Sequence, residues 1–139
     1  MEENLQVEVL TISKDDQLFK SYYLHWKAEI QNYFPDFSPE DAELCDFLML
    51  NYENQNVGLF VYQAKGEELH IEVDFVPPAF RYIGIGPSFF KSMKVDFLKQ
   101  GFTILYAITN NAAHRKYLVD DLHFTASDKH PDLYFLDLK

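Results

Sequence analysis

Basic side chains, cysteine and long apolar runs are all scarce in this 139-residue sequence. Twelve Lys and Arg stand against twenty-two Asp and Glu, and the net charge of −10 argues against binding to the phosphate backbone of a nucleic acid. The one cysteine, Cys45, excludes an internal disulfide and a cysteine-based zinc site, and the histidines lack the spacing of metal ligands, so no metal is expected. No apolar run approaches the roughly 20 residues that span a membrane. Because the sequence opens on Met1, Glu2 and Glu3, acidic where a signal peptide is basic, we expect a cytoplasmic protein with no membrane contact.

Apolar and aromatic residues, in contrast, are plentiful. They make up 47% and 17% of the sequence, which excludes intrinsic disorder as the main state of the chain. A domain of this length buries roughly two thirds of the surface of its unfolded chain. No linker, repeat or low-complexity stretch divides the sequence, so we expect residues 1–139 to form a single domain.

Charge is distributed unevenly along the chain. Residues 1–78 carry 4 basic and 16 acidic side chains, whereas residues 79–119 carry six basic side chains against Asp96 alone, a net charge of +5. An anionic ligand is therefore expected beside the second segment and a cationic ligand beside the first. The alternative is an uneven distribution over a solvated surface, with no ligand involved.

Hydrophobic periodicity predicts an α+β fold around a mixed sheet. An apolar residue recurs every four positions from Leu18 to Phe34, which predicts an amphipathic helix over residues 15–34 that Pro35 ends. Further helices are expected from Ser38 for a short stretch, from Pro87 to about Gly101, and from a cap at Asn110 or Asn111 to about Asp120. Strands are expected at 6–11, 47–52, 57–64, 69–76, 102–109, 123–126 and 133–138, with 47–76 as an antiparallel meander and 102–109 buried on both faces.

The segment between the strand at 69–76 and the helix at Pro87 has the layout of an anion site. A strand, a loop with Gly84 and Gly86, and a helix N-terminus follow one another, so unpaired backbone N–H groups and the helix dipole are aimed at one place. The loop is neither a Walker loop nor a dinucleotide fingerprint, because it lacks Gly-Lys-Ser/Thr and a third glycine. Two glycines alone are more typical of an ordinary tight turn.

Two longer motifs carry more information. Val76, Pro78, Phe80, Arg81, Gly84, Ile85 and Gly86 resemble the Arg/Gln-x-x-Gly-x-Gly/Ala loop by which the GNAT N-acyltransferase superfamily cradles the pyrophosphate of acetyl-coenzyme A (acetyl-CoA). Downstream, Asn110, Ala113 and Tyr117 match the positions of that family's Asn-x-x-Ala-x-x-x-Tyr helix, and Leu122-His123-Phe124 resembles the Leu-Gly-Phe that ends it. The resemblance covers about residues 56–126.

This resemblance implies a fold, a donor and a reaction. The fold would be a mixed, mostly antiparallel sheet of six to seven strands flanked by helices. The reaction would be transfer of an acetyl group from acetyl-CoA to a primary amine by direct attack while both substrates are bound. The resemblance implies acetyl-CoA contacts at Phe75, Val76, Arg81, Tyr82, Ile83, Gly84, Ile85, Gly86, Asn110 and Ala113.

The same resemblance suggests catalytic residues. We expect Glu72 to act as the base, directly or through a water, because His70, Glu72 and Asp74 would share one strand face by period two, and partial burial beside Asp74 would raise its basicity. Tyr117 would be the acid that protonates the departing thiolate. The alternatives are a solvent-facing strand surface for the three side chains of residues 70–74 and ordinary core packing for the tyrosine.

The acceptor is less defined by the sequence. We expect it beside Trp26, His70 and Asp74, where an aromatic and acidic wall suits a cationic small-molecule or peptide amine. The sequence departs from the family pattern at Tyr82, Ile83, Pro87 and His123 and has two extra residues between Tyr117 and Leu122. These departures leave open a non-catalytic module of the same fold that binds acyl-CoA or a protein partner, and the sequence also leaves a homodimer open.

Overall fold

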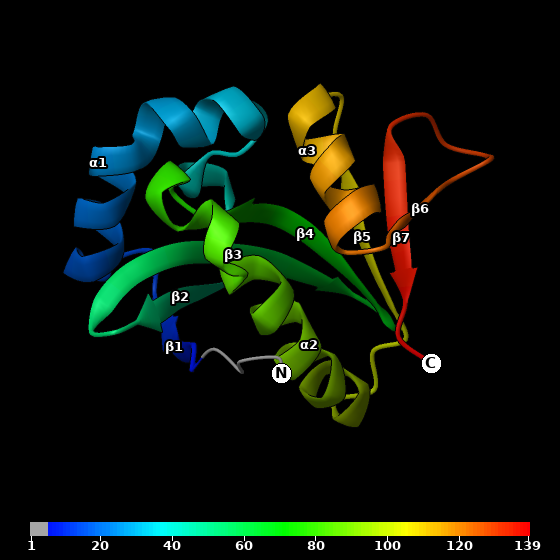
Figure 1. The fold of residues 1–139 in the computed structure, drawn as a ribbon, viewed down its shortest axis with the longest axis horizontal. Coiled ribbons are helices and arrows are strands. Elements are labelled where there is room, and N and C mark those ends of the chain that lie inside the picture. Colours follow the sequence, from blue (N-terminus) through cyan, green and yellow to red (C-terminus); the bar gives the residue numbers. More distant parts are fainter. Residues whose placement is uncertain (1–5) are drawn as a thin grey trace.

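The computed structural model describes residues 6–139, apart from the side chain of Tyr82. Seven strands and three main helices make up the described part of the chain (Figure 1). The strands are β1 (Glu8–Ile12), β2 (Asp46–Tyr52), β3 (Gln55–Lys65), β4 (Glu68–Phe75), β5 (Ile104–Ile108), β6 (Thr125–Ala126) and β7 (Leu133–Asp137). The helices are α1 (Gln17–Tyr33), α2 (Ile85–Lys99) and α3 (Ala112–Lys116), with 3₁₀ turns η1 (Pro39–Asp41) and η2 (Pro78–Ile83) and a π turn η3 (Tyr117–Asp121).

The strands form one sheet in the order β1-β2-β3-β4-β5-β7-β6. Every neighbouring pair is antiparallel except β4 and β5, which run parallel. This arrangement confirms the predicted mixed, mostly antiparallel sheet and its central meander. None of the helices in residues 6–139 is both long and apolar enough to cross a bilayer.

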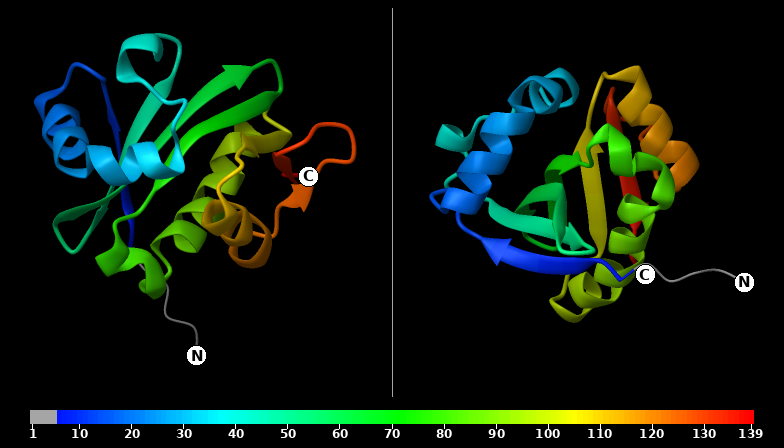
Figure 2. Two further views of the ribbon diagram at one scale, coloured as in Figure 1. Left: turned by 90° about the horizontal axis from the view of Figure 1, so that it is seen from above. Right: turned by 60° about the vertical axis from the view of Figure 1, so that its left-hand side comes forward.

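The helices lie in two layers with the sheet between them (Figure 2). One core cluster joins the sheet to α1 through Phe19, Tyr22 and Ile30. The other joins the opposite face to α2 and η3, through side chains that include Phe89, Phe97 and Leu118. Because α1 does not extend over β5, that strand buries Leu105 and Ala107 on one face while Ile108 on the other is 57% exposed. The prediction that β5 is buried on both faces was wrong for this reason.

A β-bulge in β4 sets the geometry of the middle of the sheet. Val61 of β3 pairs with Val73 and Tyr62 pairs with Ile71, so Glu72 is an extra residue in β4. A bulge bends its strand and ends regular pairing nearby. Consistent with this, β4 pairs with β5 from Glu68 to His70 and no further. Beyond His70 the two parallel strands diverge, and the gap opens toward the C-terminal ends of both.

The bulge also changes which residues face which layer. Leu69 and Ile71, before the bulge, belong to the cluster on the α2 side, whereas Val73 and Phe75, after it, belong to the cluster on the α1 side. One inserted residue moves every later side chain to the opposite face. Asp74 therefore faces the α3 side, and the prediction that it shares a strand face with His70 was wrong.

Candidate active site

An open cleft of about 310 Å³ lies where β4 diverges from β5. The end of β4 forms its floor, and the end of α1, η2, the first turn of α2 and the α3 helix form its walls. The cleft is lined by Tyr33, Phe34, Asp74, Phe75, Val76, Arg81, Gly86, Ala113, His114, Tyr117 and Asp121. Of the residues predicted for the site, Asp74, Phe75, Val76, Arg81, Gly86, Ala113 and Tyr117 are therefore gathered around one space.

The segment leading into α2 is more closed than predicted. Residues 78–83 form the 3₁₀ turn η2, which uses its amides in i→i+3 bonds, because Pro77 and Pro78 start it with a suitable φ. Gly84, with φ of 89°, then begins α2 two residues earlier than predicted. No side chain caps this helix, so its first N–H groups are available, although Pro87 contributes none.

Gly86 and Tyr117 meet at the start of α2. A Cβ at position 86 would overlap the hydroxyl oxygen of Tyr117 and lie 3.0 Å from the ring carbon that carries it. Glycine is therefore required at position 86 by the space that Tyr117 occupies, in addition to any approach of a phosphate. Burial is the main cause that raises the pKa of the Tyr117 phenol, and the charges of Asp74 and Asp121 raise it further.

Arg81, in η2, is one of the residues that line the cleft. Its Nε donates a 2.7 Å hydrogen bond to the carbonyl of Val76, and its Nη1 donates a 3.1 Å bond to the hydroxyl of Tyr33. The guanidinium also lies over the Tyr33 and Phe75 rings, 4.9 and 5.7 Å from their centroids. The resemblance implies that Val76 contacts acetyl-CoA, but its carbonyl already accepts a hydrogen bond from a side chain of the same loop.

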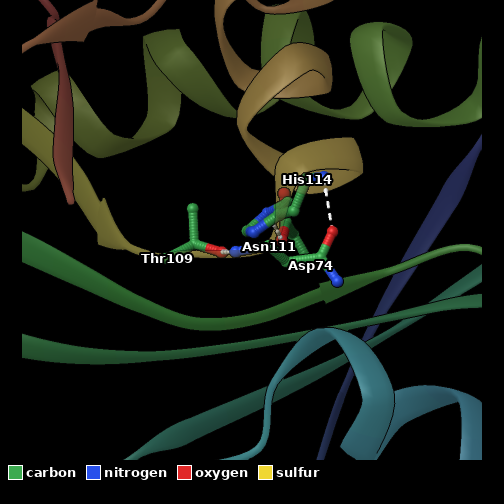
Figure 3. Close-up of polar contacts among 4 residues, drawn as sticks. All are labelled: Asp74, Thr109, Asn111 and His114. Atoms are coloured by element: carbon green, nitrogen blue, oxygen red, sulfur yellow. Dashed lines mark hydrogen bonds and ion pairs between the residues drawn. The ribbon is translucent and has the colours of Figure 1, made fainter.

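A buried ion pair connects β4 to α3. His114 Nε2 lies 2.7 Å from Asp74 Oδ1, and each side chain is 5% exposed (Figure 3). Burial lowers the pKa of His114, but the charge and hydrogen bond of Asp74 outweigh it, so that the pKa is raised from its ordinary 6.5. The ring of Phe34 packs edge-on against the imidazole at 4.9 Å.

Asn111 fixes the start of α3 and with it the backbone position of His114. Its side chain accepts a 2.9 Å hydrogen bond from the backbone N–H of His114 and so forms the N-cap of α3. Its own backbone N–H donates to Thr109 Oγ1 at 3.1 Å (Figure 3). Its side-chain amide donates to the Asn32 carbonyl at 3.5 Å. Of the two predicted caps the structure selects Asn111, and Asn110 is exposed and does not line the cleft.

Glu72 and His70 lie outside the cleft lining. His70 stacks on Tyr106 of β5 with 4.7 Å between ring centroids, at the last parallel pair before the strands diverge. Its Nδ1 is 3.1 Å from Glu72 Oε1. This contact with His70 lowers the pKa of the Glu72 carboxyl more than partial burial raises it. The prediction of a raised basicity for Glu72 was therefore wrong.

The remaining predicted residues have other surroundings. Trp26 packs on the α1 side of the sheet, 5.8 Å from the Phe75 ring, and does not line the cleft. Ile85 is fully buried in the core, Ile83 is 44% exposed, and the side chain of Tyr82 is outside the described part of the structure. Among residues 6–139, no cluster of three potential metal ligands occurs, and Cys45 is a free thiol.

Sequence reasoning missed His114, Asn111, Tyr33, Phe34 and Asp121 as residues of the site. For His114 a signal was present, since it lies three residues before Tyr117 and so falls on the same face of the motif helix. The contributions of Tyr33 and Phe34 depend on how the end of α1 approaches the cleft, which no local pattern specifies.

Comparison with known proteins extends these observations. No protein-family model matches the sequence, and no curated protein does either. Several solved structures, however, share the fold. A GNAT-family acetyltransferase from Staphylococcus aureus Mu50 has a TM-score of 0.72 at 16% identity, over 96% of this chain and 100% of that one. An acetyltransferase from Salmonella typhimurium that modifies the N-terminal serine of a 50S ribosomal subunit protein has a TM-score of 0.72 at 13% identity, over 96% and 95% of the two chains.

A third comparison includes the donor. A GNAT-family acetyltransferase from Elizabethkingia anophelis with acetyl-CoA bound has a TM-score of 0.66 at 16% identity, over 98% of this chain and 99% of that one. At such low identities the likeness is one of fold, and it extends over nearly the whole chain. The predicted resemblance is confirmed at this level: the chain has the fold of the GNAT acetyltransferases.

Proposed function

We propose that this protein is an N-acyltransferase that uses acetyl-CoA to acylate a primary amine. One observation carries the proposal. The cleft between the diverging strands β4 and β5 lies against the uncapped start of α2 and contains a phenol, a carboxylate and an imidazole from Tyr117, Asp74 and His114. An acyl transfer to an amine needs an anion anchor, a proton donor and a proton acceptor in one place.

The described residues fit acetyl-CoA. The first N–H groups of α2 and the positive-φ turn at Gly84 offer an anion site for its pyrophosphate, with Arg81 nearby. Phe75, Val76 and Ala113 line the cleft that would take the acyl-bearing arm. When bound, acetyl-CoA would supply the acyl thioester, and Arg81 would have to release the Val76 carbonyl if that group contacts the ligand.

Tyr117 is suited to the role of proton donor. A phenol is protonated at neutral pH even at its ordinary pKa, and the hydroxyl of Tyr117 lies at the start of α2, inside the cleft. Burial raises the pKa of this phenol and so makes it a weaker acid, and the role is therefore proposed from its position. A protonated phenol at this place would give its proton to a leaving thiolate. Glu72 as the base remains a prediction from the resemblance alone, since it does not line the cleft and its pKa is lowered.

The acceptor is proposed to be a small amine or the N-terminal amine of a peptide. The Salmonella protein of the same fold modifies an N-terminal serine, which makes serine peptides a sensible first choice. Tyr33, Phe34 and Asp121 also line the cleft, and they are proposed to contact the acceptor. Trp26 and His70, which were predicted to lie beside the acceptor, do not line the cleft, so their effect on the acceptor would be indirect.

Thermal unfolding with and without acetyl-CoA tests donor binding. Acetyl-CoA at 100 times its dissociation constant should stabilise the protein by about 2.7 kcal/mol and raise Tm accordingly. ATP at the same concentration is the control, because it has comparable phosphate charge and lacks the pantetheine arm. If millimolar acetyl-CoA leaves Tm where ATP leaves it, the donor assignment is wrong.

Turnover is then measured as thiol release from acetyl-CoA with a panel of amines, including a peptide with N-terminal serine, a blocked peptide with one lysine, a polyamine and an amino sugar. We expect at least one amine to be acylated. A Tm shift without release of thiol for any of them would favour the alternative, a non-catalytic module that binds acyl-CoA.

A further inference from the structure

The pair of Asp74 and His114 is the most deeply buried charged group in the cleft. Both side chains line the cleft and yet are 5% exposed, so water reaches little of either. Their 2.7 Å contact joins a strand on the floor of the cleft to the helix that forms its wall (Figure 3). A buried charge is costly unless it is paired, and this pair satisfies one atom of each partner.

The contact fixes the tautomer of the imidazole. An ionised carboxylate can only accept hydrogen bonds, so Nε2 of His114 must carry the hydrogen that Asp74 receives. In the neutral imidazole the lone pair is then on Nδ1. The cap from Asn111 to the backbone N–H of His114 and the edge-on contact with Phe34 hold the ring in this orientation.

Two polar atoms of the pair have no partner. Nδ1 of His114 and Oδ2 of Asp74 are buried and form no hydrogen bond within the described part of the chain. Leaving such buried atoms unsatisfied is costly, because their hydration is lost and no hydrogen bond replaces it. Both belong to side chains that line the cleft, so a ligand with N–H groups would complete the bonding that the protein leaves unfinished.

We propose that His114, oriented by Asp74, is the group that removes the proton from the acceptor amine. This inference rests on the proposed function. In the step, one N–H bond of the acceptor ammonium breaks, its electron pair stays on the amine nitrogen, and the proton is bound by Nδ1 of His114. Asp74 stabilises the imidazolium that results, and the proton later passes to solvent. The amine nitrogen is then neutral and able to attack an acyl carbon.

The electrostatic surroundings agree with this role. The other titratable or charged groups that line the cleft are Arg81 from η2, Tyr33 from α1, and Tyr117 and Asp121 from η3. Asp74 outweighs burial and raises the pKa of His114, which strengthens the imidazole as a base. Glu72 is a weaker candidate, since its pKa is lowered and the bulge leaves it with His70, outside the cleft lining.

The first experiment compares His114→Gln with the wild type, using the acceptor from the panel that is turned over fastest. We expect kcat/KM to fall by about 10²-fold or more while the Tm shift with acetyl-CoA is retained. In the wild type, kcat/KM should rise with pH around the pKa of His114, above 6.5, because the imidazole must be neutral to accept a proton. This rise, the acid limb of the profile, should be absent in the variant. His130→Gln, which changes an exposed loop histidine, is the matched control and should keep both the rate and the limb.

The second experiment does not depend on turnover. Nitrogen NMR of the imidazoles should show His114 as the Nε2–H tautomer, titrating above pH 6.5. Asp74→Asn should lower that pKa and move the acid limb of the rate profile to lower pH, because it removes the cause that raises the pKa. A merely structural link between β4 and α3 would change stability without moving the limb.

The outcomes separate the two proposals. No Tm shift with acetyl-CoA, or no turnover of any amine, would overturn the proposed function and this inference with it. Retained donor binding and turnover with an unchanged rate and acid limb in His114→Gln would overturn the inference alone. A fall of kcat/KM by about 10²-fold in Glu72→Gln, with an unchanged rate in His114→Gln, would do the same and would assign the base to Glu72.

Discussion

The residue at position 86 in α2 is restricted by a side chain from another element, that of Tyr117 in η3. Gly86 lies in the first turn of α2, where a side chain would overlap the hydroxyl of Tyr117. Its backbone φ is not in the left-handed region, so the requirement for glycine here is one of space. By contrast, Gly84 has a φ of 89° and is required by conformation.

Gly86→Ala should therefore lower the free energy of unfolding by about 1–3 kcal/mol, as expected for overpacking, even though alanine favours a helix. The cost should be smaller in a Tyr117→Phe background, because the atom that the Cβ overlaps is then absent while the ring carbon 3.0 Å away remains. Urea unfolding of the two single variants and the double variant gives the coupling energy. Equal costs in both backgrounds would mean that the phenol does not determine the residue at position 86.

At this scale the sequence predicted much of the site. The resemblance of two motifs to one family predicted that Arg81, Gly86, Ala113 and Tyr117 lie around one space, and they line the same cleft. The partner of Asp74 was not predictable from local spacing, since His114 lies 40 residues away and meets it only through the packing of α3 on the sheet.

The elements differ from their prediction where one residue is inserted. In β4 the extra residue Glu72 produces a bulge, which reverses the facing of the residues that follow. A strict period of two, as used to predict a shared face for His70 and Asp74, cannot reveal a bulge, because apolar and polar residues still alternate on both sides of it. The bulge nonetheless lies directly after His70, the last residue of β4 that pairs with β5, and so at the point where the cleft begins.

The end of α3 accommodates its extra residues as a π turn. Tyr117 to Asp121 form a widened turn closed by the bond from the Leu122 N–H to the Tyr117 carbonyl, at 3.2 Å. His123 then takes a φ of 63°, and the Phe124 N–H returns to the Leu118 carbonyl at 2.8 Å. This is the geometry in which a glycine usually ends a helix.

His123→Gly should stabilise the protein for this reason. The left-handed conformation costs a non-glycine residue roughly 1–2 kcal/mol, which glycine would not incur. The greater freedom of glycine in the unfolded chain cancels about 0.5–1 kcal/mol of this stabilisation. We expect the free energy of unfolding to rise by about 0.5–1 kcal/mol in urea titrations. His130→Gly, at a loop position without positive φ, is the matched control and should lower it or leave it unchanged. A decrease for His123→Gly would mean that the imidazole makes contacts that outweigh the backbone strain.

At the scale of the whole molecule, the basic and the acidic segments of the sequence occupy different parts of the fold. Residues 79–119 carry a net charge of +5 and contain α2, α3 and nearly all of η2. Each of these three elements contributes residues to the lining of the cleft. The excess of acidic residues lies in the first 78 residues, outside these elements. The net charge of −10 would by itself predict that the protein repels a polyanion such as acetyl-CoA.

Which charges dominate depends on distance. At physiological ionic strength the Debye length is about 8 Å, so charges beyond the neighbourhood of the ligand are largely screened. Arg81 lines the cleft itself, and Lys91 lies on α2 about 9 Å along the axis from Ile85, whereas Lys94 lies about 13.5 Å away. Attraction by Arg81 and Lys91 should therefore exceed repulsion by the carboxylates outside the cleft.

Added salt should then weaken the binding of acetyl-CoA. We expect Kd, measured by calorimetry between about 0.1 and 1 M NaCl, to rise by about fivefold, since two exposed charge interactions contribute roughly 0.2–1 kcal/mol each. Lys91→Ala should raise Kd at 0.1 M and flatten the salt dependence, and Lys94→Ala should have a smaller effect because it lies more than a Debye length from the helix start. Lys129→Ala, in the exposed loop before β7, should change neither. If Kd falls with added salt, the net charge of the molecule rather than the α2 segment governs the approach of the donor, and the pyrophosphate site at the start of α2 loses its electrostatic support.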